Sequence, residues 1–468
     1  METNLLNIKK LFFIFVIMLV GLWAVINLEI TGIVSLIAFF ALLFLFTRNY
    51  RSGFIALLFL KPIIDLAWDT QLFSFGSISL NLLKITGFII PFLCLVYFAM
   101  TPKIFKVNSR NSGVLLFIFI NLISIFIIFL DSFALGNVFG GLTYFFKLLN
   151  GFFIFLALPF VFDREGDDVL IIKTLFYSAI TPTILSIFLF VFGGYNVTIG
   201  QDVERFAGIY HDAGGLSINA FIGFTVSVFY LQFLNYDRGG QEKIFFKKLF
   251  ALLLIAANLL FLYLALTRIM YLVVFVFGVM WVIFYYRKYL LVLIVAPLLV
   301  LWIINNEDFR QRSWKEFRAI EEYERSGKQD KLFRFAGGGR IYMWQDAFDV
   351  IDNMDINQKL FGTGYGIAAH NEYIDIIVRT GFIGFVIFLI MLARLFFQLV
   401  NNRSTTLNPH FKSLNLFAVI LLLCFCIMSM TGYTVSQTTF GIYIWSILSI
   451  CLLFDSRNIS FNPVKPAS

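Results

Sequence analysis

His370 is the residue of this sequence best placed to move a proton. It stands in the run Ala-Ala-His-Asn-Glu-Tyr, directly after the glycine-rich loop Gly362-Thr-Gly-Tyr-Gly366. Imidazole suits proton transfer near neutral pH, and glycines let a backbone approach a ligand closely. Neighbouring arginines would keep the ring in its neutral, basic form. We interpret His370 as a candidate general base; the alternative is a structural histidine that bonds a backbone carbonyl.

Arginines are the second group of candidates, because a guanidinium is permanently charged and its fork of donors matches phosphate oxygens. Arg268 lies between two hydrophobic runs with almost no loop, and an arginine near membrane depth is costly unless it has a partner. It either extends to the membrane interface or forms an anion site. Arg205 and Arg340 join it as candidates on the same side of the membrane. His211, also on that side, could instead cap the helix that follows it.

The elements that must position these residues are membrane helices. The chain of 468 residues is 60% hydrophobic and 14% charged, against about 45–50% and 25% in soluble proteins. The excess falls into separated runs, and about 20 apolar residues span a bilayer as a helix. We expect an all-α polytopic membrane protein with about 14 transmembrane helices (12–14). The candidate spans are 11–28, 30–46, 53–67, 82–100, 113–130, 142–162, 172–192, 215–234, 249–266, 269–286, 289–304, 378–399, 414–431 and 439–454.

Lysine and arginine placement predicts the orientation of these spans. With the N-terminus in the cytoplasm, 20 of the 36 basic residues fall in cytoplasmic segments and 5 in short outer segments. This asymmetry follows the positive-inside rule and puts both termini inside. The five outer residues are Lys61, Lys84, Lys147, Arg205 and Arg268. A net charge of +8 distributed in this way does not indicate a nucleic-acid partner.

One long segment, residues 305–372, is predicted to lie outside the membrane with amphipathic helices. Aromatic and aliphatic residues between Phe309 and Tyr323 share one helical face, which indicates a helix on the membrane surface or a gating lid. A second stripe runs through Ile341, Trp344, Phe348 and Ile351. The predicted organisation is a bundle at 1–304, the outer loop at 305–372, C-terminal spans at 373–454 and a cytoplasmic tail at 455–468.

Other kinds of site have little support in the sequence. The four cysteines lie in apolar runs, there is no zinc-ligand spacing, and the glycine loop lacks the strand that precedes a nucleotide loop. We therefore expect no metal and no cofactor. Lys61 and Asp65, four residues apart inside a span, favour the rival class: a transporter or flippase of polysaccharide or lipid-linked sugar.

Three segments together resemble the O-antigen ligase and Wzy-type O-antigen polymerase family over about residues 204–400. The first is the stretch 337–388, in which an arginine, a tryptophan, a Gly-x-Gly loop and His-Asn precede a glycine-led span. The second is Leu-Ala-Leu-Thr-Arg-Ile-Met-Tyr-Leu around Arg268. The third is Glu-Arg-Phe-Ala-Gly-Ile-Tyr-His-Asp-Ala-Gly-Gly from Glu204.

The resemblance implies a GT-C-like glycosyltransferase of the bacterial inner membrane, in polysaccharide or lipopolysaccharide biosynthesis. The donor would be a glycan on undecaprenyl pyrophosphate, used at the periplasmic face, and the reaction would be metal-independent and inverting. The acceptor would be another glycan, as in a polymerase, which we favour, or the lipid A core, as in a ligase; a chain-length regulator protein would be a further partner. By resemblance His370 is catalytic, Arg268, Arg340 and Arg205 bind pyrophosphate, and Asn371, Trp344 and His211 support them.

Overall fold

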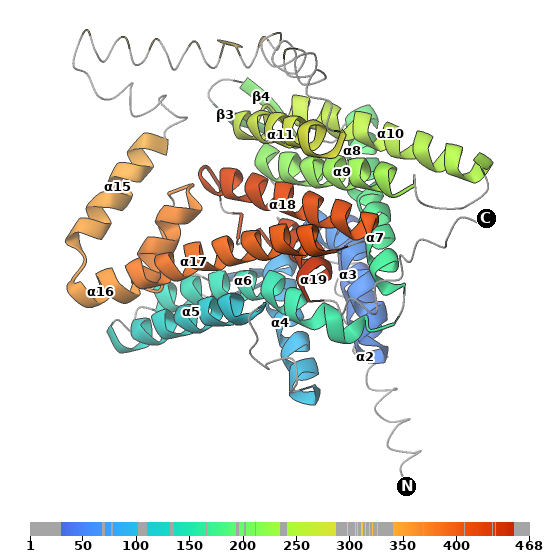
Figure 1. Ribbon diagram of the computed structural model, residues 1–468. Helices are drawn as coiled ribbons and strands as arrows, with labels where there is room; N and C mark the ends of the chain where they lie inside the picture. The colour runs from blue at the N-terminus through green and yellow to red at the C-terminus, as the bar shows by residue number, and fades with distance from the viewer. Residues whose placement is uncertain are drawn as a thin grey trace.

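The protein forms a bundle of long apolar helices, shown as a computed structural model in Figure 1. The structure describes residues 30–453 except 68–70, 76–77, 102–109, 132–134, 165, 193–195, 201–202, 211, 235–240, most of 287–339, 368, 407, 433 and 436. The predicted spans 11–28 and 289–304 therefore lie essentially outside the described residues. His211 and most of the first predicted amphipathic helix lie outside them too.

The helices of the described part follow one another along the chain with short connections. They are α2 (Ile30–Arg48), α3 (Tyr50–Ile64), the 3-10 turn η1 (Asp65–Ala67), α4 (Leu82–Met100), α5 (Ser112–Asp131), α6 (Leu135–Val161), α7 (Asp167–Ser178), α8 (Ile180–Phe192), α9 (Ala213–Leu234), α10 (Gln241–Leu264), α11 (Arg268–Trp281), the π-helical turn η3 (Val282–Tyr286), α15 (Arg340–Asn353), α16 (Ile356–Phe361), α17 (Glu372–Thr405), α18 (Pro409–Ser429) and α19 (Thr438–Leu452).

The all-α polytopic membrane fold is confirmed. Among the described residues, eight helices are long and apolar enough to cross a membrane, and three shorter apolar helices accompany them. One predicted span, 172–192, belongs to the longer candidate span Asp167–Phe192, in which α7 and α8 follow one another. Another, 378–399, is the middle of α17, which is 34 residues long.

Burial separates central helices from peripheral ones. Within the most apolar window of each span, 83% of α9 and 72% of α6 and of α18 are buried, against 22% of α10. The central helix α6 packs on α19 at Gly151, where an added Cβ would lie 2.4 Å from a ring carbon of Trp445. Only glycine leaves room for the indole at this crossing, so the two helices can come close.

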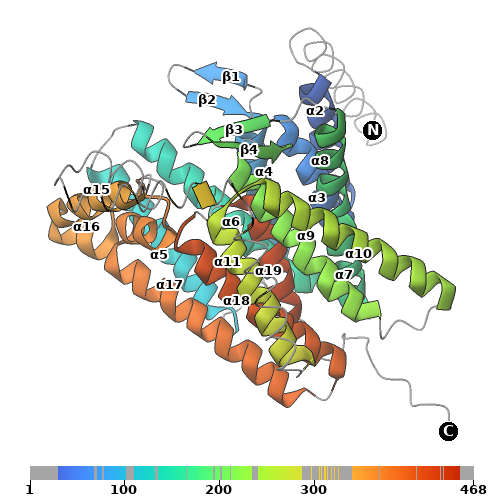
Figure 2. The same cartoon turned by 90° about the horizontal axis from the view of Figure 1, so that it is seen from above.

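Two short β-hairpins were not expected from the sequence. Strands β1 (Gln71–Phe75) and β2 (Ile78–Asn81) pair antiparallel, as do β3 (Asn196–Gly200) and β4 (Val203–Gly208). Both hairpins connect helices, and Figure 2 shows them with the bundle seen from above. Strands of four to six residues give a weak alternation signal, which the adjoining apolar runs hide.

The helices α15 and α16 lie at one end of the bundle, beside the start of α17 (Figures 1 and 2). The predicted apolar stripe of α15 was partly wrong, because Phe348 is 50% exposed. The face that packs inward is formed by Ala347, Ile351 and Met354, with Trp344 against them. Packing against the His370 loop and α17 selects this face, since Ala369, Ile374 and Val378 complete the same small core.

Candidate active site

His370 is held just outside the first turn of α17. Asn371 is the N-cap of this helix, and its side-chain oxygen accepts hydrogen bonds from the backbone N–H groups of Tyr373 (3.0 Å) and Ile374 (3.2 Å). The backbone of His370 has φ +48°, a left-handed conformation that few non-glycine residues adopt. Such strain persists only where the surroundings enforce it. The side chain remains exposed, so it can reach a substrate.

The glycine-rich loop before His370 docks on α17. Thr363 and Gly364 donate backbone hydrogen bonds to the carbonyls of Val378 (2.8 Å) and Arg379 (2.9 Å). Gly362 has φ +83°, and an added Cβ there would lie 2.1 Å from the Arg379 carbonyl oxygen. The close approach that the sequence predicted toward a ligand is therefore an approach to the helix. The loop is fixed to the same helix that presents His370.

The helix α15 supports this loop from its other side. The indole Nε1 of Trp344 donates a hydrogen bond to the carbonyl of Ala369 (3.0 Å), the residue before His370. Arg340 is the first residue of α15 and is half-buried. Trp344 thus supports the site through backbone contact, and the same helix carries a candidate arginine.

A buried polar cluster beneath His370 was missed by sequence reasoning. Glu372 is fully buried and accepts hydrogen bonds from Tyr144 Oη (2.9 Å) and the Val435 N–H (3.0 Å). Asp375 pairs with Arg379 (2.6 Å), whose guanidinium lies 3.8 Å from the centre of the Tyr144 ring. The available signal was three charged residues among the first eight of an apolar helix. They tie α17 to α6 and to the loop before α19.

Arg268 begins α11 after a very short connection from α10. Leu266, two residues earlier, has φ +49°, which is a clear outlier for a bulky side chain. Tyr271 Oη donates to the carbonyl of Tyr263 (3.0 Å) and bridges the two helices across this turn. The tight turn places Arg268 at a helix start, half-buried.

The electrostatics connect residues that are far apart in the sequence. Partial desolvation lowers the pKa of His370 below its ordinary value, the charge of Arg340 lowers it further, and Asp212 acts in the opposite sense. Burial lowers the pKa of Arg205, Asp212 raises it, and Arg268 lowers it. Asp212 is thus within electrostatic reach of both His370 and Arg205. We call Arg205, Arg268, Arg340 and His370 the basic rim.

Arg205 lies on β4, and its Nε atom is buried without a hydrogen-bond partner in the described part of the chain. Its neighbour Asp212 accepts a hydrogen bond from the Gly215 N–H (2.6 Å) at the start of α9. This is the helix-capping contact that the sequence had suggested for His211 as one interpretation. A carboxylate at the cap also places the one acidic group that reaches across the rim.

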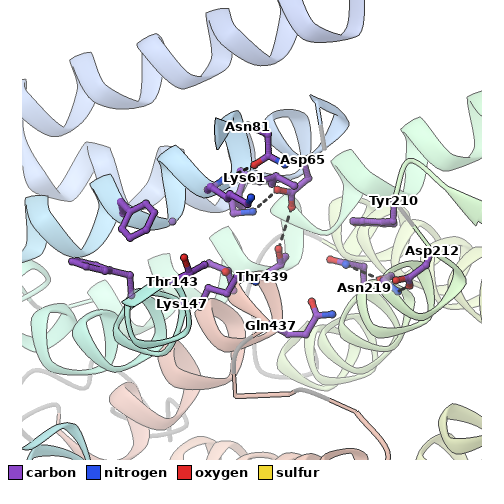
Figure 3. A pocket seen from close by; sticks show the side chains of 17 residues that line it. Lys61, Asp65, Asn81, Thr143, Lys147, Tyr210, Asp212, Asn219, Gln437 and Thr439 are labelled. Atoms are coloured by element: carbon purple, nitrogen blue, oxygen red, sulfur yellow. Dashed lines mark hydrogen bonds and ion pairs between the residues drawn. The ribbon is translucent and has the colours of Figure 1, made fainter. Parts of the chain in front are cut away.

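A cavity of about 400 Å³ adjoins the rim and shares Asp212 with it (Figure 3). The sequence had used its lysines only as topology markers. In the cavity Lys61 forms an ion pair with Asp65, and Thr439 Oγ1 donates to the same carboxylate (3.2 Å). We call this the lysine cavity; its lining includes Lys61, Asp65, Asn81, Lys84, Phe88, Thr143, Phe146, Lys147, Tyr210, Asp212, Asn219, Gln437 and Thr439.

All of the predicted site residues within the described part fall in one neighbourhood. Arg205, Arg268, Arg340 and His370 form the rim, while Asn371 and Trp344 fix its backbone. Among the described residues, no group of three His, Cys, Asp or Glu could hold a metal ion. The fold and this rim together define a polytopic membrane protein with a histidine beside a set of arginines.

The comparison with protein families gives this class a family. Residues 250–389 match the family model Wzy_C, described as O-antigen ligase. The match confirms the resemblance for this region and indicates a membrane enzyme of the O-antigen ligase and polymerase type. It includes Arg268, Arg340 and His370 and leaves out Arg205. No curated protein matches the chain.

Proposed function

We propose that this protein is a glycosyltransferase that moves a glycan from undecaprenyl pyrophosphate to the hydroxyl of an acceptor. The observation that carries the proposal is the convergence of the basic rim. Arginines from β4, α11 and α15 meet a histidine at the start of α17, with Asp212 in reach of both ends. A pyrophosphate leaving group needs charge neutralisation, and arginines in a partly dry site supply it.

In the proposed reaction, His370 removes the proton of the acceptor hydroxyl. The oxygen attacks the anomeric carbon, the bond from that carbon to the pyrophosphate oxygen breaks, and the pyrophosphate leaves with the electron pair. Attack opposite the leaving group inverts the anomeric configuration. The lowered pKa of His370 keeps its ring neutral at physiological pH, the form a base requires. Arg268, Arg340 and Arg205 hold the pyrophosphate.

The proposed orientation places the rim at the periplasmic face of the inner membrane, with both termini in the cytoplasm and 305–372 outside. Asn353 and Ser404 are both exposed and lie at opposite ends of this arrangement. A cysteine at Asn353 should react with an impermeant thiol reagent in spheroplasts, and one at Ser404 should not. The native cysteines are buried or half-buried, so they give little background. The reverse labelling would overturn the orientation.

Reconstitution with a purified lipid-linked glycan tests the transfer itself. We expect the glycan to be joined to an acceptor, in the presence of excess chelator as well as without it. Transport of the glycan across the vesicle membrane with no transfer would identify a flippase instead. Supplying a second lipid-linked glycan or a lipid A core as acceptor separates the polymerase, which we favour, from the ligase.

A further inference from the structure

We propose that the lysine cavity binds a sugar that carries a carboxylate, within one of the glycan substrates. This inference rests on the proposed glycosyl transfer and names a substrate class for it. Nothing in the three sequence segments that resemble the family concerns this cavity, because its lysines come from α3, α4 and α6.

The first argument is the position of Lys147. It lies nine residues into the candidate span Val138–Val161, roughly 14 Å along the helix axis. An ionisable residue at such depth is costly and is retained for a function. Lys147 is exposed to the space of the cavity and makes no hydrogen bond or ion pair within the described part of the chain. Its ammonium group is therefore available to an anion.

The second argument is the charge of the cavity. Three lysines, Lys61, Lys84 and Lys147, stand against two carboxylates, Asp65 and Asp212, which leaves a formal excess of one positive charge. Helices α4, α9 and α19 also begin at the cavity, and helix N-termini favour anions. One excess charge suits a carboxylate, whereas the arginines of the basic rim suit a pyrophosphate.

The third argument is the remaining lining, which fits a saccharide. Amide and hydroxyl side chains of Asn81, Asn219, Gln437 and Thr143 both donate and accept hydrogen bonds, as sugar hydroxyls do. Phe88 and Phe146 offer rings 4.8 Å apart for the apolar face of a sugar. Figure 3 shows the labelled polar groups around one common space. A volume of about 400 Å³ lies in the range of roughly 300–1,000 Å³ typical of ligand sites.

The contact with the rim gives the cavity its place in the reaction. Asp212 lines the cavity and also acts on His370 and Arg205. A sugar seated against Lys147 therefore extends from the reacting end of a glycan toward the interior of the bundle. The cavity would select glycans by the charge of one residue near the new bond.

The test measures binding to the full chain purified in detergent, without any donor. The probes are tetrasaccharides that contain glucuronic or galacturonic acid, each beside the same tetrasaccharide with its carboxyl groups reduced to alcohols. We expect at least one acidic probe to bind more tightly than its reduced form. Lys147→Gln should weaken that binding roughly 10- to 100-fold, the effect of losing a charge-assisted hydrogen bond. Lys147→Arg should keep most of it, and the exposed control Lys412→Gln should not change it.

Equal binding of acidic and reduced probes, or unchanged binding by a folded Lys147→Gln protein, would overturn the inference. So would competition by inorganic pyrophosphate that depends on Lys147, since the cavity would then be a phosphate site. If Lys147→Gln does not fold, Gln437→Ala on the opposite wall replaces it, with an expected loss of roughly 2- to 10-fold. Intact transfer with no acidic-probe binding defeats only this inference; probe binding at Lys147 without any transfer defeats only the proposed function.

Discussion

The basic rim and the lysine cavity are neighbours that hold positive charge in different ways. The rim groups stand on a hairpin, at helix starts or just before a helix, and Asp212 is the carboxylate whose charge is felt at both His370 and Arg205. The cavity lysines lie within helices, and Lys61 is paired with Asp65 there. The rim therefore concentrates charge for a multiply charged group, whereas the cavity offers a balanced polar space. One region suits the chemistry of the leaving group and the other the selection of a sugar.

The largest effect that would sharpen this comparison is expected at His370. Replacing it with alanine removes the proposed base, which is typically worth about 10²–10⁴-fold in rate. Binding of the lipid-linked donor should stay nearly unchanged, because the arginines hold the pyrophosphate. Turnover and donor binding should be measured on the same preparation. Lost donor binding with normal turnover of bound donor would make His370 a phosphate ligand.

Arg268→Ala should slow transfer about 10²–10³-fold, the effect of losing one preorganised charge-stabilising contact. Unlike the histidine variant, it should also weaken donor binding, since the guanidinium acts on the pyrophosphate before and during reaction. Lys412→Gln is the matched control, because it removes an exposed positive charge elsewhere. An Arg268→Ala enzyme with normal donor affinity and normal turnover would remove Arg268 from the rim.

The buried support under the rim is expected to contribute to stability as well as activity. Glu372→Gln cannot accept hydrogen bonds from both Tyr144 and the Val435 N–H on both of its terminal atoms, so one buried group loses its partner. We expect a loss of about 1–3 kcal/mol in the free energy of unfolding, together with slower turnover as α17 loosens. Thermal unfolding in detergent measures it, and the exposed Glu321→Gln is the control. Equal stability of the two variants would contradict this role.

The smallest effects are shifts in pH dependence, and they have opposite signs. The neutral form of His370 is active, so activity falls as pH drops through its pKa, which lies below the ordinary value. Arg340→Gln removes a charge that lowers this pKa, so the acid limb should move to higher pH. Asp212→Asn removes a charge that raises it and keeps the capping oxygen, so the limb should move to lower pH. Shifts in the same direction would show that these residues do not act on His370 through their charge.

The sequence was informative about the rim because charge in a membrane protein is scarce. The positive-inside count assigned Lys61, Lys84, Lys147, Arg205 and Arg268 to one side, and three of them line one cavity while the other two interact in the rim beside it. Apolar runs of the right length gave most of the described helices. The hairpins were missed because four to six residues between apolar runs carry too little alternation.

What the sequence by itself determined was the membrane fold, the family of residues 250–389 and the polar residues worth considering. Their type and spacing carry that information locally, through span length, charge asymmetry and motif order. The tertiary structure decided what each residue contacts. It turned the glycine loop toward α17, chose Ala347 instead of Phe348 for the inner face of α15, and gathered lysines from three helices into a cavity. Such pairings depend on which helix faces meet, and no local pattern specifies that.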